Sequence, residues 1–236
     1  MFNRVSSFTL ALVLFSVLAG SANNISIFTA SLVLLMVATF IINLKRIGLS
    51  WAHLLLPMLF LLGVGSVFIV ITSSTLRLVF LLGAAIAFYL LEMNLGRESH
   101  LLQNIYLLSA FALYVGIFSL EFYLQLNTTL ILLLVFFVSY ILSIQGFAGF
   151  SLPAKKYFYL LIAVSLTEAA WGLTYWPTHY VVNAVVIFCL FYLLWIFSFS
   201  VFFGKLTRKK IFLQLGLVTF VLLITLTSAA WRPLIG

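Results

Sequence analysis

Long apolar runs alternate with short polar stretches along the whole chain. Nine of these runs approach the roughly 17–25 residues that a helix needs to cross the hydrocarbon core of a membrane. We therefore predict an all-α fold, a polytopic bundle of transmembrane helices in a single integral-membrane domain over 1–236. The runs cover about 5–22, 25–44, 51–72, 76–95, 101–125, 129–145, 157–176, 179–203 and 211–231.

The basic residues collect in alternate connections between these runs. One side of the predicted membrane has Arg4, Lys45, Arg46, Arg97, Lys155, Lys156, Lys205, Arg208, Lys209 and Lys210. The other side has only Arg77 and Arg232. Because basic loops mark the cytoplasmic side, we predict that the N-terminus lies inside and the C-terminus outside.

Two alternatives accompany this topology. Arg4, the apolar run at about 5–22 and the small residues at 19–22 also fit a signal-anchor or a cleavable signal peptide, and cleavage would leave eight helices. The outer turns at 73–75, 127–129 and 177–179 each precede a helix with aromatic residues near its middle, which favours tandem two-helix hairpins. Ordinary capping by Ser, Thr and Asn explains the same turns.

Composition agrees with the membrane prediction. The chain is 65% hydrophobic and 7% charged, whereas a soluble domain has about 25% charged residues. The net charge of +8 comes from the inner connections, so it indicates orientation in the cell membrane and not nucleic-acid binding. We expect membrane lipids as partners, and a membrane protein or a second copy of the chain as a further partner.

Ionisable side chains within the apolar runs are the candidate functional residues, because a charge inside a membrane is costly. Glu168 lies about 16 Å from the inner end of its predicted helix, near the bilayer centre. Helical spacing aligns Trp171, Gly172 and Tyr175 with it. His179 and Asn183 follow at i and i+4 in the next helix, which suggests that the two faces meet.

Glu121 and Arg77 belong to the same outer level. We hypothesise one polar cluster of Arg77, Glu121, Glu168, His179 and Asn183, rimmed by Trp171, Tyr175 and Trp176. It would form either a cavity open to the outside or a hydrogen-bonded network that holds the helices in register. Glu92 is interpreted separately, as a solvated helix end that reaches water or Arg97.

The sequence lacks the residues and motifs that several kinds of membrane enzyme and cofactor-binding protein require. Every lysine lies at an inner connection, the lone cysteine is Cys189, aspartate is absent, and no zinc or phosphate-loop motif occurs. We expect neither a cofactor nor a metal, and no family resemblance is found. The sequence favours a non-enzymatic membrane component, either an assembly subunit or a small-molecule or lipid handler. The alternatives are a proton- or cation-coupled transporter, with Glu168 and Glu121, and an outer-leaflet enzyme that acts on a lipid-linked substrate.

Overall fold

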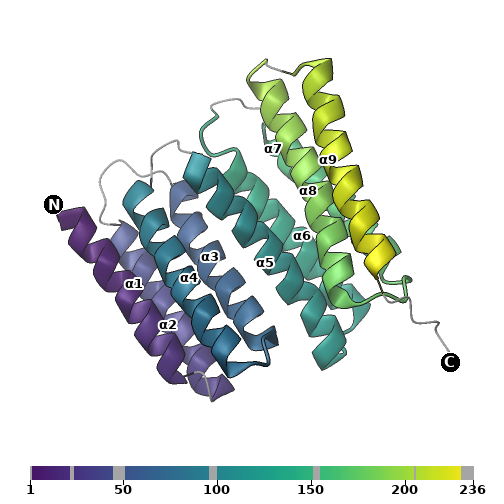
Figure 1. Ribbon diagram of the computed structural model, residues 1–236. Helices are drawn as coiled ribbons and strands as arrows, with labels where there is room; N and C mark the ends of the chain where they lie inside the picture. Colours follow the sequence, from purple (N-terminus) through teal and green to yellow (C-terminus); the bar gives the residue numbers. More distant parts are fainter. Residues whose placement is uncertain are drawn as a thin grey trace. The chain divides into compact units, whose positions relative to one another are not determined.

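The structure is a computed structural model that describes residues 2–21, 24–44, 51–95, 100–150, 155–204 and 206–229. These residues form nine α-helices and no strand, which confirms the all-helical prediction (Figure 1). The helices are α1 (Phe2–Ser21), α2 (Ile25–Leu44), α3 (Trp51–Val70), α4 (Ser74–Asn94), α5 (His100–Leu124), α6 (Thr128–Gly146), α7 (Lys155–Leu173), α8 (Tyr180–Phe202) and α9 (Arg208–Ser228).

Six of these helices are long and apolar enough to cross a membrane, namely α2, α4, α5, α6, α8 and α9. The described parts of α1 and α3 contain shorter apolar stretches, Val5–Ser21 and Leu54–Val70. Such a set of helices fits an integral membrane protein. The orientation across the membrane and the tandem hairpins stay predictions, and Lys45, Arg46, Arg97, Lys205 and Arg232 lie outside the described residues.

The helix ends follow from local capping. Asn127 precedes α6 and its side chain accepts a hydrogen bond from the Thr129 amide at 3.0 Å. Thr207 caps α9 in the same way through the Lys210 amide. Such caps satisfy backbone N–H groups that have no partner within the helix. α7 ends at Leu173, three residues before the predicted end, because the chain turns there and the Trp176 amide bonds the Leu173 carbonyl at 2.9 Å.

The chain divides into two compact units. Unit 1, Met1–Leu113, contains α1 to α4 and the first part of α5. In this unit α1 packs against α2 and α4, while α3 packs against α2 and α4. Aromatic rings fill its interior: Phe28 of α2 stacks on Phe68 of α3 with ring centroids 4.5 Å apart, and Phe60 lies 6.0 Å from Phe88 of α4.

Unit 2, Tyr114–Gly236, contains the rest of α5 and α6 to α9. α7 packs between α6 and α8, and α9 packs along α8. Tyr114 is fully buried, contacts the Phe191 ring and shares a 2.9 Å hydrogen bond with Ser139. By contrast, Val218 is the one buried residue among those described in α9. A single side-chain hydrogen bond, from Tyr192 to Gln214 at 2.7 Å, is described between α8 and α9.

Candidate functional site

Glu168 lies on α7, closer to the C-terminal end of the helix than the sequence estimate. At a rise of 1.5 Å per residue it is about 20 Å from the Lys155 end and about 8 Å from the Leu173 end. The difference arises because α7 begins and ends earlier than the predicted segment. The side chain is exposed, and the structure shows no hydrogen bond or ion pair from it to any described residue.

Five exposed residues line one side of α7 and of the turn that follows it, and we call this stripe the α7 face. It consists of Leu161, Val164, Glu168 and Trp171 of α7 and of Tyr175 in the turn. The opposite side of the helix is buried and contains Tyr159, Ile162, Ala163, Leu166, Ala170 and Leu173. The predicted alignment of Glu168, Trp171 and Tyr175 is therefore present, and it faces away from the interior of unit 2.

The surface along the α7 face is uneven. Trp171 and Tyr175 touch edge to face, with ring centroids 6.0 Å apart. Gly172 lies beside them, and a Cβ atom added there would have no neighbour within 4 Å among the described residues. Two large aromatic rings next to a residue without a side chain leave room in which a second helix can approach closely.

Asn183 and His179 have different surroundings, although they are one helical turn apart. Asn183 is buried and accepts a 2.7 Å hydrogen bond from the Thr178 hydroxyl, which fixes the entry into α8. His179 is exposed and caps α8, because its Nδ1 accepts from the Val181 amide at 3.4 Å. Both bonds stabilise the helix start, a role that Asn and other polar residues commonly fill.

Glu121 lies near the C-terminal end of α5 and is partly exposed. The neighbouring rings of α5 and α8 contact one another: Phe122 lies 5.3 Å from both His179 and Tyr180, and Tyr123 lies 5.7 Å from Tyr180. Aromatic rings at this level are typical of the membrane–water interface. The structure shows no hydrogen bond or ion pair between Glu121 and any other described residue.

Arg77 belongs to unit 1 and interacts with the end of α3. Its Nε donates a 2.6 Å hydrogen bond to the Ile71 carbonyl, and its guanidinium carbon lies 5.4 Å from the Phe68 ring centroid. A cation at the C-terminal end of a helix is favourable, and so is one over an aromatic face. Arg77 and the other six candidate residues lie in different units, so each is described within its own unit and the five-residue cluster stays a prediction.

Glu92 corrects the sequence interpretation. The sequence predicts a solvated helix end here, but the side chain of Glu92 is only 2% exposed. Its Oε1 accepts a 2.9 Å hydrogen bond from Nδ2 of Asn43, which is 1% exposed on α2. Glu92 does lie near the end of α4, as the sequence predicts, but its side chain is buried because other helices pack around it. Asn43 was missed, although an amide near the end of an apolar run is itself a signal.

Two further polar side chains are buried in the same part of unit 1. Thr39 lies one turn before Asn43 on α2 and is 1% exposed. Ser7 of α1 is fully buried and adjoins Phe8, whose ring contacts Tyr89, one turn before Glu92. Unit 1 thus buries polar side chains of α1 and α2 as well as the carboxyl group of α4, and among these the hydrogen bond between Asn43 and Glu92 is described.

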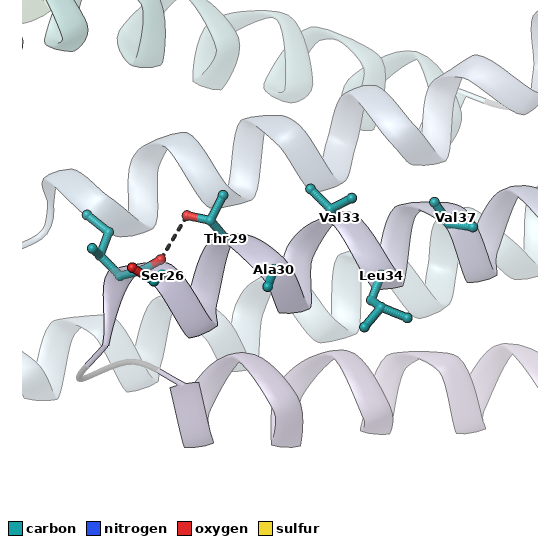
Figure 2. Close-up of a pocket in the computed structure, with 7 residues that line it drawn as sticks. Ser26, Thr29, Ala30, Val33, Leu34 and Val37 are labelled. Atoms are coloured by element: carbon teal, nitrogen blue, oxygen red, sulfur yellow. Dashed lines mark hydrogen bonds between the residues drawn. The ribbon is translucent and has the colours of Figure 1, made fainter.

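A shallow groove of about 710 Å³ runs along the outer surface of α2 (Figure 2). Ile25, Ser26, Thr29, Ala30, Val33, Leu34 and Val37 line it. The hydroxyl group of Thr29 in this groove donates a hydrogen bond to the Ile25 carbonyl at 2.8 Å. Such an apolar surface is suited to contact with lipid chains.

No family model, curated protein or solved structure gives a significant match to this chain.

Proposed function

We propose that this chain is a non-enzymatic assembly subunit of the cell membrane, which binds a partner helix along the α7 face. Its N-terminus would lie on the cytoplasmic side. The observation that carries the proposal is the exposed carboxyl group of Glu168 on a helix whose remaining exposed neighbours are apolar or aromatic. An ionisable group in contact with lipid is costly, so a partner that covers it gains binding energy.

The chemistry of the face specifies the partner. Glu168 offers a hydrogen-bond acceptor or a negative charge about 8 Å from the outer end of α7. A membrane helix with an arginine or lysine at the same depth would satisfy it. Trp171 and Tyr175 supply large, rigid contact surfaces of the kind enriched in binding sites. Gly172 allows close approach of the partner backbone.

Designed peptides test this proposal without requiring the natural partner. The purified full-length chain is placed in lipid nanodiscs with one of three transmembrane peptides, which differ only in an Arg, Gln or Leu about 8 Å from the outer end. Binding is measured by energy transfer between fluorophores. A polar contact between membrane helices contributes up to about 1.7 kcal/mol, so the Arg peptide should bind about tenfold more tightly than the Leu peptide.

Variants show whether Glu168 causes that preference. Glu168→Gln should remove the difference between the Arg and Leu peptides, whereas Glu121→Gln, the same chemical change on α5, should preserve it. Equal binding of all three peptides to the wild-type chain would contradict the proposal. Energy transfer between labelled copies of the chain that depends on Glu168 would identify a second copy as the partner.

A further inference from the structure

A basic surface lies at the end of unit 2 where α8 ends and α9 begins. Both helices are long and apolar enough to cross a membrane, so this end lies at one membrane surface. α9 opens with three cations, and α7, which packs on α8, opens with two more. We call these residues the basic patch: Lys155, Lys156, Arg208, Lys209 and Lys210. All but Lys155, which is part-buried, are exposed.

Aromatic contacts fix the start of α7 against the end of α8. The Phe158 ring of α7 lies 4.8 Å from that of Phe202, the last residue of α8. Phe150, which precedes α7, lies 4.9 Å from Phe203, which follows α8 on the way to α9. The two groups of cations therefore share one end of unit 2. The Lys155 ammonium donates a 2.6 Å hydrogen bond to the Phe150 carbonyl, and two of its three N–H donors remain for an anion.

The acidic side chains of unit 2 lie far from the basic patch. Glu121 and Glu168 are the only acidic residues in the sequence of this unit. Glu168 lies about 20 Å along α7 from Lys155. Glu121 precedes the start of α6, which is about 28 Å long and meets α8 at its other end, where Phe147 contacts Phe202. Since no acidic side chain of unit 2 neutralises the patch, its charge complements an anionic partner.

Exposed apolar side chains follow the cations directly along the same helix faces. On α9, Phe212 and Leu213 follow Lys209 at i+3 and i+4, and they are 73% and 60% exposed. On α7, Leu160 follows Lys156 at i+4 and is 50% exposed. A ligand that covers both parts carries negative charge next to hydrocarbon. An anionic phospholipid combines these properties, whereas inorganic phosphate or a nucleic acid has no hydrocarbon chain to place beside Phe212 and Leu213.

We propose that the basic patch binds the headgroup of an anionic phospholipid, whose acyl chains lie along the exposed apolar side chains of α7 and α9. Basic residues beside a membrane helix attract anionic lipids, and each cation contributes about fivefold to the affinity. The predicted orientation places this end on the cytoplasmic side, whose leaflet carries the negative surface potential. None of the patch residues belongs to the α7 face, so the inference is independent of the proposed partner helix.

Thermal unfolding of the full-length chain in detergent micelles tests the site. The micelles contain increasing mole fractions of phosphatidylglycerol or of phosphatidylcholine with the same acyl chains. Phosphatidylglycerol should raise Tm, on the order of 5 °C at saturation, and phosphatidylcholine should raise it less. Lys209→Gln combined with Lys210→Gln should increase the half-maximal mole fraction of phosphatidylglycerol about 30-fold, and Lys156→Gln alone about fivefold. The control, Lys45→Gln combined with Arg46→Gln, removes two charges that follow α2 in the sequence and should leave it unchanged.

Three results would overturn the site. The first is an equal rise of Tm with both lipids, and the second is a control variant that weakens the response as much as the patch variant does. The third is an equal rise with glycerol phosphate alone, which would assign the patch to a free anion. If the double patch variant does not fold, Lys156→Gln still decides, because it changes one exposed side chain on a different helix.

Discussion

Substitutions of Glu168 and Asn183 should have different effects on the free energy of unfolding, because Glu168 is exposed and Asn183 is buried. Glu168 makes no described interaction within the chain. Because its side chain is already exposed in the folded protein, its environment changes little on unfolding. Glu168→Gln should therefore alter the free energy of unfolding by less than about 0.5 kcal/mol. Asn183→Ala removes the acceptor of the 2.7 Å bond from Thr178 and leaves a small cavity in α8. It should cost about 1–2 kcal/mol.

The measurement is unfolding of each purified chain in mixed micelles, followed by the fluorescence of its tryptophans. Wild type, Glu168→Gln and Asn183→Ala are compared under the same conditions. A loss above about 1 kcal/mol in Glu168→Gln would refute the reasoning, because surface positions rarely cost so much. Such a loss would show that the carboxyl group has a partner within the chain.

Three other predictions follow from the packing and the predicted topology. Gly63→Ala should lower the free energy of unfolding by about 1–3 kcal/mol, because its Cβ would lie 3.0 Å from that of Ala112. Gly83→Ala should be neutral or stabilising, because its Cβ would meet no described atom within 4 Å. Equal effects of the two substitutions in an unfolding measurement would contradict this prediction. Tyr114→Phe should cost about 0.5–1.5 kcal/mol, measured by unfolding, because Ser139 loses its partner; an unchanged free energy would mean that the bond contributes nothing. For topology, impermeant thiol reagents applied to sealed cells should label a cysteine at Asn127 but not one at Thr207, and the reverse pattern would invert the orientation.

The helices were predictable from the sequence because membrane thickness sets a length that each apolar run must meet. What could not be predicted is which side of each helix is buried. Most of these helices are apolar on all sides, so no amphipathic stripe marks the interior. The sequence therefore places Glu168 on a helix, but the exposure of its side chain follows only from the packing of α7 on α6 and α8. Glu92 shows the converse, since a helix end that appears open in the sequence is covered by α2 through Asn43.

The loose attachment of α9 has a consequence for how the protein responds to its bilayer. A helix of 21 residues is about 32 Å long, close to the hydrocarbon thickness of an average membrane. Because α9 packs against α8 alone among the described helices, we expect its tilt to follow that thickness. In a thinner bilayer we expect α9 to tilt more strongly, while the hydrogen bond between Tyr192 and Gln214 keeps that point of α9 against α8. The helices packed on several sides cannot tilt in this way without disturbing their neighbours.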